Sequence, residues 1–127
     1  MIQVSRLDHI TITSRDPENS IAFYRDILGM SVANEWPGEL TALQAGDTFL
    51  AISWRQKGKN LTKIPDIAIH HFALRVSRED FTRAQSWLPS KGIQVELEDN
   101  GVNGSLYLRD PDNHLVELAC YEAKTSK

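Results

Sequence analysis

Short stretches in which apolar and polar side chains alternate recur along this chain. Because successive strand residues face opposite sides of a sheet, the alternation predicts strands that bury one face. In the clearest case Val116 and Leu118 occupy alternate positions after a turn at residues 110–113, whose Pro, Asp and Asn residues favour tight turns. Strands are expected over residues 4–13, 30–36, 40–45, 49–54, 68–76 and 93–98. One further strand is expected before the 110–113 turn and one after it.

Two other stretches carry apolar residues at helical spacing. The first follows Asp16 and Pro17, which suit the N-cap and the first helical position, and it ends at Gly29. The second follows Ser77, which starts a sequence resembling a capping box, and it ends at Gly92. Both glycines are expected to end their helices in the left-handed conformation.

The order of these elements repeats. Each half begins with a strand that contains a histidine, His9 or His71, passes through one capped helix and continues into three strands. Two β-α-β-β-β halves, each with an apolar sheet face under a helix, predict an α+β fold. We expect one domain over residues 1–127, with module one at 4–55, a polar linker at 56–67 and module two at 68–121.

Charge and cysteine content exclude several classes of protein. The net charge is −3, and no local cluster of Lys and Arg provides a footprint for nucleic acid. The single cysteine, Cys120, rules out an intramolecular disulfide and indicates a reducing compartment. No apolar run is long enough to span a membrane, and the N-terminus does not resemble a signal peptide. A cytoplasmic protein is expected.

Three predicted strands carry a metal-ligating side chain on the face away from the core. His9 and His71 lie on the polar faces of their strands, and Glu117 stands between Val116 and Leu118 in the most apolar strand of the chain. A carboxylate in such a strand needs a cation or hydrogen-bond donors. Two imidazoles and one carboxylate are the ingredients of a three-ligand metal site with open positions.

Four motifs in this order resemble the vicinal oxygen chelate superfamily, which includes glyoxalase I, bleomycin- and fosfomycin-resistance proteins and extradiol ring-cleaving dioxygenases. The resemblance covers residues 5–120. It implies an open mixed-sheet barrel of two modules around a metal cleft, and a homodimer whose sites are often shared between chains. The motifs are the tetrapeptides that begin at His9 and His71, residues 23–29, and residues 110–117.

The resemblance also assigns roles to individual residues. His9, His71 and Glu117 match the metal ligands of the family. Tyr107 matches a tyrosine that contacts the substrate or its oxyanion, and a phenol can donate to a developing negative charge. Each residue also has a plainer reading, as a satisfied polar residue of a cleft or, for Tyr107, as a core tyrosine. The expected substrate contacts are Thr11, Ser105 and Trp54.

Four further positions carry structural expectations. Pleat alternation predicts that His70 points away from His9, as a packing or surface residue. His114 is expected to hydrogen-bond the turn before Glu117, either structurally or in support of the metal ligands. Trp87 lies on the apolar stripe of the second helix and is expected in the core. Residues 122–127 are expected to form a frayed tail.

The leading interpretation is a divalent-metal enzyme acting on a small molecule with two adjacent oxygens, and the most specific form of it is an extradiol-type dioxygenase. Two histidines and one glutamate also form the facial triad of non-haem Fe(II) oxygenases, which favours Fe²⁺ over Mn²⁺, Zn²⁺ or Ni²⁺. Neither nucleic acid nor membrane is an expected partner.

Three alternatives stay open. A fosfomycin-resistance-like transferase or hydrolase would lack its phosphonate clamp, because Leu97 stands where those proteins carry a lysine. A glyoxalase-like lyase would lack its extra Glu or Gln, because the strand at residues 48–54 offers none. A bleomycin-resistance-like binding protein would not need the metal ligands at all.

Overall fold

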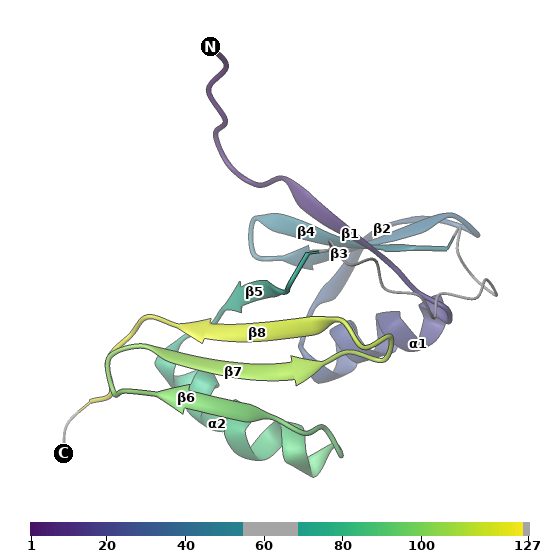
Figure 1. Cartoon of the computed structure of the whole chain (residues 1–127). Coiled ribbons are helices and arrows are strands. Elements are labelled where there is room, and N and C mark those ends of the chain that lie inside the picture. The colour runs from purple at the N-terminus through teal and green to yellow at the C-terminus, as the bar shows by residue number, and fades with distance from the viewer. Residues whose placement is uncertain (55–68, 126–127) are drawn as a thin grey trace. The chain divides into compact units, whose positions relative to one another are not determined.

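The computed structural model describes residues 1–54 and 69–125, and it divides into two units, Met1–Ile64 and Pro65–Lys127 (Figure 1). Each unit is described by itself, and the predicted linker at 56–67 lies outside the described residues. The first unit contains β1 (His9–Thr13), α1 (Pro17–Ala22), the π-helical turn η1 (Phe23–Ile27), β2 (Ser31–Trp36), β3 (Leu40–Ala45) and β4 (Thr48–Ser53). The second contains β5 (Phe72–Arg75), α2 (Arg78–Ser90), β6 (Glu96–Asp99), β7 (Gly104–Arg109) and β8 (Leu115–Cys120).

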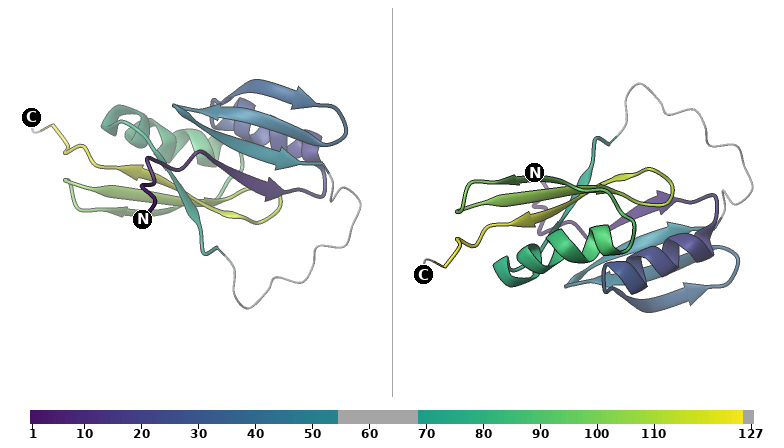
Figure 2. Two further views of the ribbon diagram at one scale, coloured as in Figure 1. Left: turned by 90° about the horizontal axis from the view of Figure 1, so that it is seen from above. Right: turned by 90° about the horizontal axis from the view of Figure 1, so that it is seen from below.

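Both units have the same topology, which confirms the predicted repeat of β-α-β-β-β modules. The strand orders are β1-β4-β3-β2 and β5-β8-β7-β6, each an open, four-stranded mixed sheet. In each sheet the first strand pairs in parallel with the last, and the other pairs are antiparallel. Each helical segment lies along one face of its own sheet (Figures 1 and 2).

The predicted helix signals act as expected. The side chains of Asp16 and Ser77 each accept a hydrogen bond from a backbone N–H three residues later, at 3.3 and 3.1 Å. Gly29 and Gly92 follow the helices with φ of 75° and 78°, in the left-handed region. Within the described ranges, no helix combines the length and the apolar character needed to cross a membrane.

Three strands are shorter than predicted. β1 begins at His9 instead of residue 4, β5 covers only Phe72–Arg75, and β6 begins at Glu96. A strand persists only where a neighbour supplies hydrogen-bond partners. His9 is the first residue of β1 with a partner in β4, and Phe72 is the first of β5 with a partner in β8. The neighbouring strand, which alternation does not reveal, therefore sets these limits.

Alternating apolar residues form the core of each unit, as the pattern predicts. In the second unit Phe81 of α2 packs with the buried faces of β7 and β8. The expectation that Trp87 is in the core is wrong, because its side chain is 40% exposed and carries the Lys91 ammonium 4.5 Å from the ring centroid. The fully or nearly fully buried residues include Tyr24, Leu43, Leu50 and Ile52 in the first unit and Leu106, Leu108, Val116 and Leu118 in the second.

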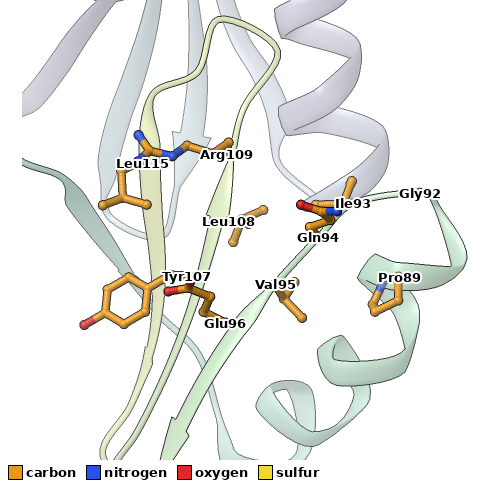
Figure 3. Close-up of a pocket in the computed structure, with 10 residues that line it drawn as sticks. All are labelled: Pro89, Gly92, Ile93, Gln94, Val95, Glu96, Tyr107, Leu108, Arg109 and Leu115. Atoms are coloured by element: carbon orange, nitrogen blue, oxygen red, sulfur yellow. The ribbon is translucent and has the colours of Figure 1, made fainter.

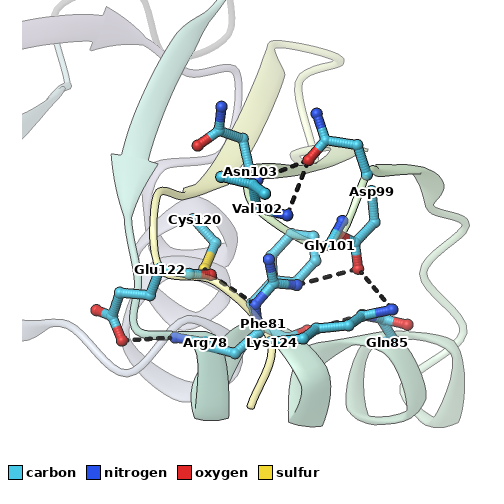
Figure 4. A network of polar contacts seen from close by, with 11 residues as sticks. Arg78, Phe81, Gln85, Asp99, Gly101, Val102, Asn103, Cys120, Glu122 and Lys124 are labelled. Carbon is cyan, nitrogen blue, oxygen red and sulfur yellow. Dashed lines mark hydrogen bonds and ion pairs between the residues drawn. The ribbon is translucent and has the colours of Figure 1, made fainter. Parts of the chain in front are cut away.

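The predicted frayed tail is wrong for residues 122–124, which are held by a polar network (Figure 4). Arg78 donates from Nε to the carbonyl of Glu122 at 2.8 Å and from a terminal nitrogen to Asp99 at 3.0 Å. Lys124 donates its backbone N–H to Gly101 at 2.8 Å and pairs with Asp99 at 3.3 Å. The N–H of Gly101, with Arg78 and Lys124, keeps the pKa of Asp99 below its usual value.

Gly104 is closely packed and supplies a test of this core. A Cβ added at Gly104 would lie 2.6 Å from Cζ of Phe81, whose side chain is fully buried. We expect Gly104→Ala to lower the free energy of unfolding by about 1–3 kcal/mol through overpacking, measured by urea denaturation. In a Phe81→Leu background the same change should cost much less. Equal costs in both backgrounds would show that this contact does not limit the packing.

Candidate functional site

The side chains of His71 and Glu117 meet in the second unit. Nε2 of His71 lies 3.0 Å from Oε1 of Glu117. Glu117 is opposite Ala73 in the parallel pairing of β8 with β5, and His71 precedes Ala73 by two residues. The pairing thus brings the imidazole and the carboxylate to one sheet face, opposite the buried Val116 and Leu118.

Ser105 holds the other oxygen of this carboxylate. Its hydroxyl donates to Oε2 of Glu117 at 2.8 Å from the neighbouring strand β7. The Glu117 side chain is only 12% exposed, so both carboxylate oxygens have partners at a site with limited access to water. Ser105 was expected to contact substrate, and in this arrangement its donor fixes the orientation of Glu117.

Tyr107 lies next to the pair. It is directly opposite Glu117 in the antiparallel pairing of β7 with β8. Its ring centroid lies 6.0 Å from that of His71, with the two ring planes at 79°. The phenol leaves β7 in the opposite direction from the side chain of Leu108 (Figure 3). The second unit therefore gathers His71, Ser105, Tyr107 and Glu117, the four candidates that sequence places in module two.

The remaining candidates belong to the first unit. His9 is exposed and pairs through Nδ1 with Asp8 at 2.8 Å, and Thr11 is exposed on the same face of β1. The indole N–H of Trp54 donates to Thr41 at 3.0 Å. Across residues 1–54 and 69–125, no three His, Cys, Asp or Glu side chains cluster closely enough to hold a metal ion. The structure brings together His71 and Glu117, two of the three predicted ligands, and the metal-binding role of all three stays a prediction.

His70 is exposed, as the sequence predicts for a surface residue. Its Nδ1 lies 2.8 Å from Nδ1 of His71, so the two rings are hydrogen-bonded. Adjacency to His71 was the one sequence signal that pointed to this contact.

His114 holds the turn before Glu117, as expected. Its Nδ1 lies 2.8 Å from Oδ2 of the buried Asp110, and its backbone N–H donates to Oδ1 of the same carboxylate at 2.8 Å. The hydrogen bond to Asp110 raises the pKa of His114 above its usual value, although partial burial acts against it. This turn fixes where β8 begins and so supports the position of Glu117.

A separate hollow of about 850 Å³ lies between the end of α2 and strands β6 and β7 (Figure 3). Its walls are mostly apolar, with Pro89, Val95 and Leu108 among them, and Glu96 and Arg109 provide charge. Tyr107 is the one candidate among its lining residues. The hollow is thus an apolar neighbour of the candidate site and does not contain the His71–Glu117 pair.

The sequence matches a known protein family over most of its length. Residues 6–118 match the model of the glyoxalase/bleomycin resistance protein/dioxygenase superfamily. The chain belongs to this superfamily. The match includes both modules and every candidate site residue.

Several individual members of the superfamily are similar to this chain. A metallothiol transferase FosB of Staphylococcus epidermidis is 31% identical over 91% of this chain and 83% of its own length. The catechol-2,3-dioxygenase of Bacillus subtilis (strain 168) is 25% identical over 90% of this chain, which spans 41% of that enzyme. The crystal structure of the fosfomycin resistance protein FosX from Listeria monocytogenes shares the fold, with a TM-score of 0.74 at 21% identity, over 93% of this chain and 94% of that one.

The raised pKa of His114 predicts a pH-dependent stability. Because the pKa of His114 is higher in the folded state, its ionisation stabilises the folded protein. This stabilisation is complete when the pH is below the unfolded-state pKa of about 6.5, and it is lost as the pH rises through the folded-state pKa. We expect the free energy of unfolding of the wild type to exceed that of His114→Asn by roughly 1 kcal/mol at acidic pH, and by much less at alkaline pH. The difference is small because the His114 side chain is 31% exposed, so water screens the ion pair. Urea denaturation across this pH range measures the difference. A gap that does not change with pH would contradict the ion pair.

Proposed function

We propose that this protein is a divalent-metal-dependent enzyme that acts on a small molecule with two adjacent oxygens. In this proposal His9, His71 and Glu117 hold the metal. The observation that supports it is the His71–Glu117 pair, an imidazole and a carboxylate directed at each other from adjacent strands. The two modules would form an open mixed-sheet barrel around the metal cleft.

The pair fits a divalent ion. The imidazole of His71 and the carboxylate of Glu117 would supply one nitrogen and one oxygen ligand, which are ligand types that such ions accept. The observed distance from Nε2 of His71 to Oε1 of Glu117 is 3.0 Å. Two histidines and a carboxylate suit Fe²⁺ best, and Mn²⁺, Zn²⁺ or Ni²⁺ remain alternatives. When bound, the ion would supply Lewis-acid stabilisation of negative charge on a substrate oxygen.

The neighbouring side chains have distinct tasks in this proposal. Ser105 donates to Glu117 and keeps one carboxylate oxygen turned toward His71. Tyr107 is the proposed catalytic residue, and its phenol would donate a hydrogen bond to the oxyanion that develops on the substrate. Thr11 and Trp54 are proposed substrate contacts from the first module.

We infer group transfer to an electrophilic carbon as the leading reaction. The relative named a metallothiol transferase is matched over 83% of its length, whereas the named dioxygenase is matched over 41%. A thiolate sulfur would attack an epoxide or carbonyl carbon, a carbon–oxygen bond would yield its electron pair to oxygen, and that oxygen would take up a proton. Fosfomycin-resistance proteins carry a phosphonate-binding lysine at the position of Leu97, which is half-exposed on β6. Leucine cannot pair with a phosphonate, so a substrate without this group is favoured.

Extradiol-type dioxygenase activity is the second candidate. The similarity to a catechol dioxygenase and the two-histidine, one-carboxylate set both support it. A glyoxalase-like lyase is less favoured, because β4 offers no fourth carboxylate or amide ligand. The homodimer with shared sites and the cytoplasmic location stay predictions.

Metal content tests the proposed site directly. Protein purified without oxygen or chelator should contain about one divalent ion per chain by elemental analysis, as a three-ligand site requires. Glu117→Gln and His71→Ala should lose most of it. Glu79→Gln serves as the matched control for Glu117→Gln, because it makes the same change at an exposed carboxylate of α2 outside the pair, and it should keep its metal. No metal in the wild type, even after reconstitution, would leave a binding protein of the bleomycin-resistance kind.

Substrate assays separate the two reaction classes. We expect consumption of a thiol together with a small epoxide or dicarbonyl, and Tyr107→Phe should reduce kcat by about 10²–10³-fold through loss of one donor to the oxyanion. The variant should bind metal like the wild type. Oxygen uptake on catechols, with no thiol consumption, would instead establish the dioxygenase.

A further inference from the structure

His70 and His71 form a hydrogen bond between two imidazole rings, which is an unusual support for a metal ligand. Their Nδ1 atoms are 2.8 Å apart, and the rings meet edge to face with centroids at 5.0 Å and planes at 78°. A metal-bound histidine normally directs its second nitrogen to a carboxylate, a backbone carbonyl or water. Here that second nitrogen is bonded to a side chain that can act as either donor or acceptor.

The positions of the protons follow from the partners of His71. A hydrogen bond between two ring nitrogens contains one proton, so one ring donates and the other accepts. Nε2 of His71 faces a carboxylate oxygen of Glu117 at 3.0 Å, and a carboxylate only accepts. A neutral imidazole that donates to Glu117 from Nε2 has no proton on Nδ1. In that tautomer Nδ1 of His71 would accept from Nδ1–H of His70.

Coordination requires the opposite arrangement. A lone pair on Nε2 of His71 must be free for the ion, so the ring proton must lie on Nδ1. Nδ1–H would then donate to His70, whose own proton would lie on Nε2. His70 is exposed, so its outer nitrogen can exchange a proton with water. The His70–His71 hydrogen bond can thus persist in both states with its direction reversed.

We propose that His70 is a positioning residue for His71. It holds the imidazole of His71 against Glu117 and, when metal binds, stabilises the tautomer that offers the Nε2 lone pair. A carbonyl or carboxylate could support only the metal-bound tautomer, whereas an imidazole supports both. This inference rests on the proposed metal site. In it His70 acts only through His71 and contacts neither substrate nor metal.

The matched variants are His70→Ala and His70→Asn. Alanine removes the partner of Nδ1, whereas an asparagine amide places a donor and an acceptor near the position of the lost Nδ1. We expect His70→Ala to weaken Zn²⁺ or Co²⁺ binding by about 10–100-fold, the usual cost of removing such a partner. His70→Asn should restore most of the affinity, and Glu79→Gln, at an exposed position of α2, should leave the affinity unchanged. Titration calorimetry and the visible spectrum of Co²⁺ measure these effects.

Nitrogen-15 NMR of the His71 ring in mildly alkaline buffer gives a readout independent of activity. Wild type should carry the proton on Nε2 without metal and on Nδ1 with Zn²⁺. In metal-free His70→Ala, Glu117 should still hold the proton on Nε2, and the Nδ1 resonance should shift because Nδ1 has lost its partner in His70.

The outcomes separate the inference from the proposed function. If His71→Ala abolishes metal binding while His70→Ala leaves both affinity and ring shifts unchanged, the role of His70 is wrong and the metal site stands. If wild type binds no ion, the metal site is wrong. In that case the ring shifts of metal-free His70→Ala still decide whether His70 orients His71: altered shifts keep that part of the inference, and unchanged shifts overturn it.

Discussion

The register of β8 between β5 and β7 is the constraint on which the candidate site depends. Val116 and Leu118 are buried, so the carboxylate between them must leave the opposite face of the sheet. The same register sets Glu117 opposite both Ala73 and Tyr107. A slip by one residue would turn Glu117 into the core and expose its apolar neighbours, at a cost no local contact could offset. Burial of the apolar face therefore secures the geometry of the polar one.

Local patterns were sufficient to predict most of the fold. Alternation, caps and left-handed glycines act within a few residues, and they correctly indicated two modules of the same order. The ends of the strands could not be predicted in this way. They depend on where a neighbouring strand starts, which is a property of the assembled sheet, as the late start of β1 at His9 illustrates. The exposed position of Trp87 was missed for a similar reason, because helical spacing does not reveal how far the sheet extends beneath a helix.

The sequence indicated the two residues that meet in the candidate site but not the contacts that support them. His71 and Glu117 stood out as polar residues on otherwise apolar strands, and the structure brings them together. The contact of His70 with His71 was not predicted, because pleat alternation directs neighbouring side chains to opposite faces and does not indicate that their rings can meet. The hydroxyl of Ser105 was expected to contact substrate, whereas it is bonded to Glu117. Such bonds depend on side-chain reach across strands, which a single sequence does not encode in its spacing.

The matching topologies of the two units place their differences at equivalent positions. In β4 of the first unit Ala51 pairs with Thr11, and in β8 of the second Glu117 pairs with Ala73. In both units a histidine lies two residues before the first-strand member of this pair. Only the second unit has a carboxylate, Glu117, in the pair itself. If the halves arose by duplication, they have since diverged at this position, and the first half has either lost an acidic residue there or never had one. Some alanine and glutamate codons differ by a single base, so an acid at the position of Ala51 can be reached by a single mutation.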